Sequence, residues 1–276
     1  MRQASGSVPI YDSANRGLPA IEELRELFNY RELVFQTVRR NIVVRYKRSI
    51  LGVAWTMLNP LGTALILTFV FSAAFGAGSN YAVYVLSGLV AWNFFAQTTN
   101  DAMLNLLWGG SLIKRIYMPK TVFGVSSTGT GLINLTLALV PLLIIMLITR
   151  VPIQVSILFL PYPILLIAMF TLGISLLISA CAMFFPDIAE MYNILLTAWF
   201  YLTPVIWVED MLPQQFAWLV KLNPMFYLIN LFRIPIIEGD LPDINQILFT
   251  SGIAFFTLFA GWLFFSWKSD EFAYRV

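Results

Sequence analysis

The sequence of 276 residues lacks histidine, has one cysteine and is poor in charged side chains. Without histidine there is no imidazole for a metal site or for acid–base catalysis. The single Cys181 rules out a disulfide within the chain, and its place in an apolar run predicts a small packing residue. Charged residues make up 12% of the chain and hydrophobic residues 59%, whereas a soluble domain carries roughly a quarter charged residues. This composition predicts an integral membrane protein that is all-α.

Uncharged stretches define the predicted spans. Residues 49–100 include no charged side chain at all. A membrane-spanning helix needs roughly 20 apolar residues, so this stretch is long enough for two spans joined by a turn at 76–80. The rest of the chain, treated in the same way, predicts six transmembrane helices in the region 49–276, near residues 50–75, 81–104, 121–149, 154–185, 191–208 and 246–267.

Two cytoplasmic segments precede the first predicted span. Residues 1–28 are predicted to form a cytoplasmic N-terminal arm, polar over 1–17 and with a short helix over 18–28, and residues 29–48 are predicted to form a basic amphipathic helix on the membrane surface. Asn29 is the expected N-cap of this helix because Glu32 follows three residues later, which is the spacing of a capping box.

The predicted surface helix has two different faces. Apolar side chains recur at intervals of four, with Phe35 beside them: Val34, Val38, Ile42 and Tyr46. Basic side chains lie on the other side and continue to the membrane boundary: Arg39, Arg40, Arg45, Lys47 and Arg48. One interpretation is a simple surface anchor with snorkelling cations. The other is one half of an inner docking surface, because a second basic segment containing Lys114, Arg115 and Lys120 follows the second span.

The distribution of lysine and arginine predicts the orientation. These residues concentrate in the N-terminal arm, in the surface helix and in the second basic segment, whereas the loops on the other side carry few. Positive residues favour the cytoplasmic side, so both termini are expected in the cytoplasm.

Residues 209–245 do not fit a spanning helix. They contain two short apolar pieces, at 216–222 and 225–237, separated by Asn223 and Pro224. Apolar pieces of this length are typical of re-entrant or interfacial helices, and we expect them between the fifth and sixth spans on the outer side.

Several kinds of chemistry are missing from the sequence. The predicted spans contain almost no ionisable residue, with Asp101 as the main exception, whereas ion-coupled carriers place such groups at depth. The cytoplasmic side shows no carboxylate cluster for a divalent metal and the chain has no Walker A pattern. The chain is therefore predicted to have no catalytic residues and no metal site, and any ATP must be bound by another subunit.

Aromatic residues are the remaining side chains of the spans that could contact a ligand. The second span contains Trp92 and Phe95, and the fifth region is crowded with Trp199, Phe200, Tyr201 and Trp207. For any one of them, anchoring at the membrane interface is the simpler explanation. The alternative is an aromatic translocation path on which sugar rings stack.

Five segments together resemble the membrane permeases of ABC-type exporters for polysaccharides, including O-antigen, capsule and teichoic acid. They are RYKRSILGVAWTMLNPL (45–61), LSGLVAWNFF (86–95), LIKRIYMPK (112–120), FFPDIAEMYNILLTAWFYLTPVIW (184–207) and NPMFYLINLFR (223–233). The resemblance covers nearly the whole chain after residue 28. Pro186 departs from it, because a basic residue commonly stands there in the family.

The resemblance implies a homodimer in the bacterial plasma membrane, associated with two nucleotide-binding ATPase subunits that bind ATP and Mg. The surface helix would be the interface helix resting on the ATPase, through Val34, Phe35, Val38, Arg39, Arg40 and Ile42. Arg45, Lys47, Arg48, Lys114, Arg115 and Lys120 would handle the head group of a polyprenyl-linked polymer at the cytoplasmic entrance. The short helices would form an outer gate with Asn223, Pro224, Phe226 and Tyr227.

We therefore expect the membrane subunit of an ATP-driven exporter of a lipid-linked polysaccharide or teichoic-acid-like polymer, in contact with membrane lipids and not with nucleic acid. Two alternatives are an exporter of a drug or small lipid, and a non-transporting scaffold for glycan synthesis.

Overall fold

The computed structural model describes residues 19–47, 51–52, 54–71, 80–109 and 118–274. Over these residues every regular element is a helix, as the composition predicts. The predicted turn at 76–80 and three predicted entrance residues, Arg48, Lys114 and Arg115, lie wholly or largely outside the described residues.

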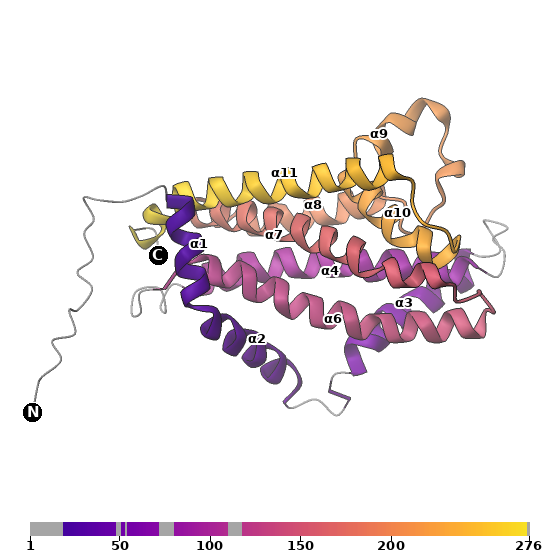
Figure 1. Ribbon diagram of the computed structural model, residues 1–276, viewed down its shortest axis with the longest axis horizontal. Helices are drawn as coiled ribbons and strands as arrows, with labels where there is room; N and C mark the ends of the chain where they lie inside the picture. Colours follow the sequence, from indigo (N-terminus) through magenta and orange to yellow (C-terminus); the bar gives the residue numbers. More distant parts are fainter. Residues whose placement is uncertain (1–18, 48–50, 53, 72–79, 110–117, 275–276) are drawn as a thin grey trace, which may run out of the picture.

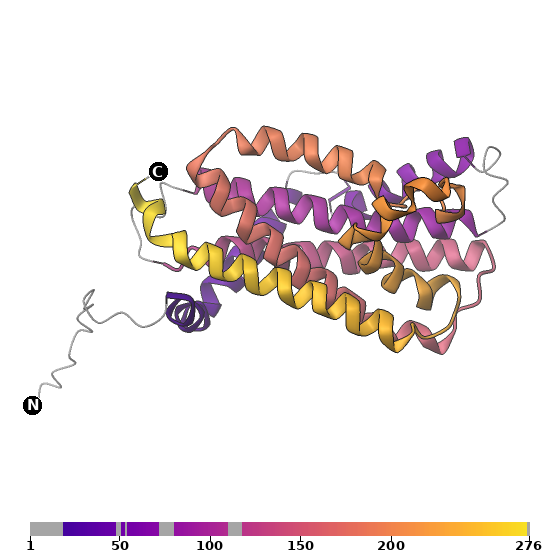
Figure 2. The same ribbon diagram turned by 90° about the horizontal axis from the view of Figure 1, so that it is seen from above.

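Six helices run lengthwise in the bundle, and each corresponds to one predicted span, although three of them extend beyond the predicted bounds (Figures 1 and 2). They are α3 (Ala54–Phe71), α4 (Tyr81–Trp108), α6 (Thr121–Ile148), α7 (Pro161–Phe184), α8 (Ile188–Leu202) and α11 (Ile244–Lys268). A short 3₁₀ helix, η1 (Val155–Phe159), precedes α7, whose first residue is a proline that suits a helix start.

Four segments are long and apolar enough to cross a membrane: Ala54–Phe71, Thr121–Ile148, Val155–Phe184 and Ile244–Phe272. The other two lengthwise helices are not among them. α8 has only 15 residues. α4 has 28 residues but carries amide, hydroxyl and acidic side chains, which lower its hydropathy. The six-span topology therefore stays a prediction.

The start of the surface helix differs from the expectation. The chain forms α1 (Pro19–Asn29) and α2 (Arg31–Tyr46), with Tyr30 between them and no side-chain cap on α2. The capping box at Asn29 is wrong, because Asn29 is the last residue of α1. Backbone bonds continue across the junction, from Tyr30 N to Glu26 O and from Val34 N to Tyr30 O. No helix start exists at Asn29 for its side chain to cap.

The two ends of the bundle are built differently (Figure 1). At one end, called here the α1 end, the indole of Trp262 in α11 donates to Ala20 O at 3.1 Å, and η4 (Ser269–Tyr274) follows α11. At the other, the α10 end, lie η2 (Glu209–Met211), η3 (Gln214–Phe216), α9 (Ala217–Lys221) and α10 (Pro224–Ile237). The N-terminal helix and the C-terminal tail therefore share one end, and the short helices expected at 209–245 lie at the opposite end.

α4 is the central helix of the core. It packs against α3, α6, α7, α8 and α10, and its side chains are largely buried. α8 lies at the edge of the bundle (Figure 2) and exposes Met191, Ile194 and Leu195. α4 thus lies among most of the other lengthwise helices.

Candidate functional site: a polar cavity beside α4

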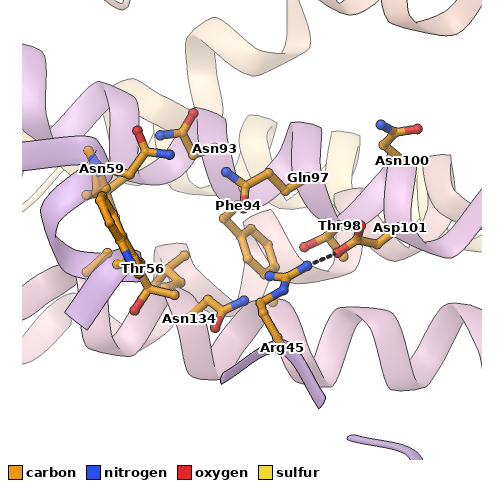
Figure 3. A pocket seen from close by; sticks show the side chains of 16 residues that line it. Arg45, Thr56, Asn59, Asn93, Phe94, Gln97, Thr98, Asn100, Asp101 and Asn134 are labelled. Atoms are coloured by element: carbon orange, nitrogen blue, oxygen red, sulfur yellow. Dashed lines mark hydrogen bonds and ion pairs between the residues drawn. The ribbon is translucent and has the colours of Figure 1, made fainter. Parts of the chain in front are cut away.

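A cavity of about 360 Å³ lies between α3, α4 and α6, with the end of α2 at its rim (Figure 3). Nine of its sixteen lining residues are polar, although the surrounding helices are apolar. The polar residues are Arg45, Thr56, Asn59, Asn93, Gln97, Thr98, Asn100, Asp101 and Asn134. Aromatic side chains, Trp55 and Phe94, complete part of the wall.

The helical repeat explains why α4 supplies so many of these groups. Asn93, Gln97 and Asn100 follow one another at intervals of four and three residues, with Asp101 next to Asn100. Residues at these intervals share one face of a helix. Figure 3 shows these side chains on one ribbon, with Thr56 and Asn59 opposite them and Asn134 on a third helix. The cavity is therefore a polar seam on α4 that α3 and α6 enclose.

An ion pair closes one end of the cavity. Nη2 of Arg45 lies 2.9 Å from Oδ2 of Asp101 (Figure 3). The side chains are 39% and 41% exposed, so water screens the pair and its contribution to stability is small. Its importance is geometric, because it joins the end of α2 to the C-terminal third of α4.

The protein does not use all polar groups of the cavity wall for its own structure. The Thr98 hydroxyl and the side-chain oxygen Oδ1 of Asn100 are buried and have no hydrogen-bond partner within the described part of the chain. Buried polar atoms are usually hydrogen-bonded. Amides both donate and accept hydrogen bonds, and ring faces can stack on the apolar face of a sugar. The cavity is therefore suited to a ligand that carries many hydroxyl groups.

Four of the predicted path aromatics form a cluster on a different face of α4. Ring centroids of Trp92 and Phe200 are 5.5 Å apart, and those of Phe95 and Trp199 are 5.1 Å apart. Trp92 and Phe95 are buried. These rings pack α8 onto α4 rather than line the polar cavity.

The other two predicted aromatics lie at the α10 end. Tyr201 and Trp207 line an apolar pocket of about 350 Å³, and the Trp207 indole donates to Tyr201 O at 3.1 Å. The structure thus divides the six aromatics between a packed cluster and a separate pocket. A continuous aromatic path stays a prediction.

The interface-helix residues also divide into two groups. Val34, Val38 and Ile42 are half-buried on the side of α2 that packs against α6. Arg39 and Arg40 are exposed, as is Phe35 with 64% of its surface accessible. The periodicity predicted the apolar side correctly, but Phe35 belongs to the outward face.

Of the predicted entrance cations, Arg45, Lys47 and Lys120 are described. Arg45 pairs with Asp101 at the cavity, and Lys47 is exposed. The ammonium group of Lys120 donates to the backbone oxygen of Ser269 and lies 5.6 Å from the Phe272 ring centroid. Lys120 therefore ties the start of α6 to the C-terminal tail.

The predicted gate residues lie at the start of α10. Asn223 is the N-cap, and its side-chain oxygen accepts from Met225 N at 3.0 Å. Pro224 is the first residue of the helix, a position that suits proline. Phe226 and Tyr227 are half-buried neighbours whose ring centroids are 5.1 Å apart. Their placement at the start of one helix agrees with the predicted separation of two apolar pieces at Asn223 and Pro224. A gating role stays a prediction.

Sequence reasoning noted Asp101 but missed the amides beside it. Asn93, Gln97 and Asn100 lie in a stretch that was assigned as a span only because it has no charged residue. Their spacing was the available signal, because amides repeated along one face of a predicted spanning helix face other protein or a polar space rather than lipid.

A helical bundle with four segments long enough to cross a membrane, and a polar cavity inside it, is the architecture of a multi-pass membrane protein. Residues 32–237 match the family described as ABC-2 type transporter, and the chain belongs to this family.

Three curated relatives illustrate the similarity. The O-antigen export system permease protein RfbA of Myxococcus xanthus is 28% identical over 260 residues, which cover 93% of this chain and 100% of the relative. The RfbA protein of Klebsiella pneumoniae is 27% identical over 226 residues, covering 80% and 87%. The capsule polysaccharide export inner-membrane protein CtrC of Neisseria meningitidis is 22% identical over 219 residues, covering 76% and 81%.

Proposed function

We propose that this chain is the membrane-spanning subunit of an ATP-driven exporter that moves a lipid-linked polysaccharide or teichoic-acid-like polymer across the bacterial plasma membrane. The family assignment supports a transport subunit. The names of its relatives, which refer to O-antigen and capsule export, support a polysaccharide as the cargo.

The observation that carries the proposal is the amide-lined cavity of about 360 Å³ within apolar helices. Placing Asn93, Gln97, Asn100 and Asn134 in a lipid-facing bundle is costly unless they have polar partners. A polysaccharide offers hydroxyl groups as both donors and acceptors, so the amides can exchange hydrogen bonds with a sugar as it passes. An exporter of apolar drugs or small lipids would have little use for this lining.

Energy must come from a partner, since the chain has no Walker A pattern. We assign the contact with a nucleotide-binding subunit, which would bind ATP and Mg, to the outward face of α2, where Phe35, Arg39 and Arg40 are exposed. Movement of α2 would reach the cavity through the bond between Arg45 and Asp101. Arg45 would also attract the phosphate of a polyprenyl carrier at this rim.

The proposal includes a homodimer of six-span subunits with the α1 end in the cytoplasm. The exposed cations Arg39, Arg40 and Lys47 lie on α2 or at its end, and positive residues favour the cytoplasmic side. α8 would complete the set of spans together with α4, and its exposed apolar side chains would face lipid or the second copy.

The experiment that tests the proposal is co-purification with the candidate ATPase subunit, followed by ATP hydrolysis with and without lipid-linked polymer. A stable complex whose ATPase activity rises with one class of polymer is the expected result. Stimulation by a drug or a small lipid instead would favour that alternative class of exporter. A chain that binds no ATPase would be better explained as a scaffold for glycan synthesis, and the proposal would be wrong.

A further inference from the structure

The chain leaves helical geometry between α8 and η2, over residues 203–207, while it is still inside the protein. Thr203 and Val205 are each 0% exposed, and Pro204 is also buried. Carbonyl groups in such a break have lost their helical partners, and where they are buried they cannot bond to water. Side chains from α4 and α10 bind them instead.

Arg233 of α10 supplies two of these bonds. Its Nη1 donates to Pro204 O at 2.6 Å, and its Nη2 donates to Val205 O at 2.9 Å. Nη2 also donates to the backbone oxygen of Tyr84 in α4 at 3.0 Å. One planar guanidinium therefore connects three backbone oxygens from two separate parts of the chain, a task for which its fixed fork of donors is suited.

Tyrosines of α4 bind the remaining carbonyls of the break. The Tyr81 hydroxyl donates to Ile206 O at 2.9 Å. The Tyr84 hydroxyl lies within hydrogen-bond distance of two oxygens, Pro204 O at 3.2 Å and Trp207 O at 3.0 Å. Each carbonyl from residue 204 to residue 207 thus has a side-chain donor, so the path of the break is held at four consecutive points.

The surroundings of Arg233 are shaped for this role. The residue is 5% exposed, and it contacts carbonyl oxygens and the Tyr84 ring, whose centroid lies 3.7 Å from Cζ. No carboxylate pairs with it among residues 19–47, 51–52, 54–71, 80–109 and 118–274. A Cβ at Gly88 would lie only 3.1 Å from Cζ and would collide with Nη2. Gly88 therefore leaves the space that the guanidinium fills.

Asn223 provides a second connection from α10 to the end of α8. Its Nδ2 donates to the Thr203 hydroxyl at 2.8 Å, and its Oδ1 accepts from the Trp199 indole at 2.8 Å. Trp199 in turn packs on Trp92 and Phe95 of α4. The end of α8 is therefore held at two places, by Asn223 at Trp199 and Thr203 and by Arg233 at residues 204 and 205.

We infer that Arg233 is a positioning residue for export, which fixes the break at 203–207 and makes α4, α8 and α10 move as one unit at the α10 end. The inference rests on the proposed export function. Without the guanidinium, Val205 O loses its donor and Pro204 O keeps only the Tyr84 hydroxyl. α8 can then shift relative to α4 without carrying α10 with it, and ATP hydrolysis no longer produces a defined movement at this end.

The test compares Arg233→Met and Arg233→Lys with Lys221→Met, a matched control at an exposed cation of the same end. Two quantities are measured on the assembled complex with its ATPase. The first is hydrogen exchange of a peptide covering residues 202–208, which reports on the break itself and needs no substrate. The second is the amount of polymer exported per ATP hydrolysed, which a loss of folded protein alone does not change.

For Arg233→Met we expect faster exchange in this peptide and a roughly tenfold drop in polymer exported per ATP, since charged hydrogen bonds are lost. Arg233→Lys should give a smaller drop, because an ammonium keeps the charge but not the fork. In the double variant Tyr84→Phe with Arg233→Met, the fold drop in polymer exported per ATP should be smaller than the product of the two single drops. The reason is that both residues bind Pro204 O.

Three outcomes would overturn the inference. Unchanged exchange in Arg233→Met would mean that the guanidinium does not hold the break. Faster exchange with normal export per ATP would mean that the contact has no part in export, and a loss of complex yield with a normal ratio would make Arg233 merely structural. A wild-type complex that exports no polymer would instead overturn the proposed function, while the exchange data would still decide whether Arg233 holds the segment.

Discussion

The guanidinium of Arg45 binds the carboxylate of Asp101 at 2.9 Å, and these residues belong to helices with different tasks. Arg45 is on α2, which packs along the bundle against α6. Asp101 is on α4, which forms one wall of the polar cavity. Together with the packing of α2 on α6, this bond links α2 to the wall of the cavity.

Breaking this pair is expected to weaken coupling without unfolding the protein. Because both side chains are partly exposed, the pair should contribute less than about 1 kcal/mol to stability, so Arg45→Gln and Asp101→Asn should melt near the wild-type temperature. Polymer stimulation of the partner ATPase should fall in both variants. The double exchange Arg45→Asp with Asp101→Arg should regain part of it, because the link between α2 and α4 is restored.

Arg150→Gln is a suitable control, since Arg150 is an exposed cation in the turn after α6. Normal stimulation in both single variants would contradict the proposed link. A double exchange as inactive as Arg45→Gln would show that the cation itself is needed at position 45, as expected if it binds a phosphate.

The amides of the cavity are expected to contribute to polymer movement. Asn93→Leu and Gln97→Leu each remove donors and acceptors from the seam on α4. A lost hydrogen bond costs about 1 kcal/mol, or roughly fivefold in binding, and each variant should lower the export rate by about that factor. Gln246→Leu removes an amide from the exposed start of α11 and should export normally. Equal export by all three variants would exclude the cavity as a polymer site.

How far the sequence predicts this structure depends on the kind of signal. Helices buried in lipid have a strong local signature, so the positions of α6, α7 and α11 follow from uncharged runs. The start of α10 can be predicted from Asn223 and Pro224. Asparagine suits the N-cap, and proline suits the first helical position after it. These features depend on residues that are neighbours in the chain.

Features that depend on distant residues were not predictable in the same way. Nothing near Arg233 indicates that its partners are the carbonyls of residues 204 and 205 and of Tyr84. Lys120, for which a role at a substrate entrance stays a prediction, also binds the tail at Ser269, a contact that no local pattern indicates. Asn29 had the correct spacing for a cap and failed, because α1 continues through it. In each case the tertiary contact, which local pattern does not encode, decides the outcome.

The contact between α7 and α11 should be intolerant of added volume. A Cβ at Gly173 would lie 2.6 Å from the Thr257 carbonyl carbon, and one at Gly261 would lie 2.8 Å from the Gly173 carbonyl carbon. Because both obstacles are backbone, Gly173→Ala and Gly261→Ala must push the helices apart, at a cost of about 1–3 kcal/mol. Thermal unfolding followed by size-exclusion chromatography should show a lower midpoint for both.

Gly252→Ala provides the control within α11, because an added Cβ there meets nothing within 4 Å. This variant should be at least as stable as the wild type, since alanine favours a helix. If all three alanine variants melted alike, the close approach of α7 and α11 would be incorrect.

The outward face of α2 should decide binding of the ATPase subunit. Phe35 is 64% exposed although it is a large aromatic residue, and it lies on the outward face with Arg39 and Arg40. Phe35→Glu should remove an apolar anchor and place a carboxylate in the contact. We expect this variant to lose the ATPase on co-purification while its own yield in detergent stays normal. Phe216→Glu, which changes an exposed phenylalanine at the α10 end, should retain the ATPase.

The inner face of α2 gives the complementary test, because Val38 is half-buried on the side that packs against α6. Val38→Ala should loosen α2 from α6 and reduce coupling, yet leave the outward face intact for the ATPase. The expected result is therefore a complex of normal yield with weaker polymer stimulation, opposite to the loss of binding in Phe35→Glu. If both variants lost the ATPase equally, α2 would act as a single packed unit, and the division of its residues into a docking face and a coupling face would be wrong.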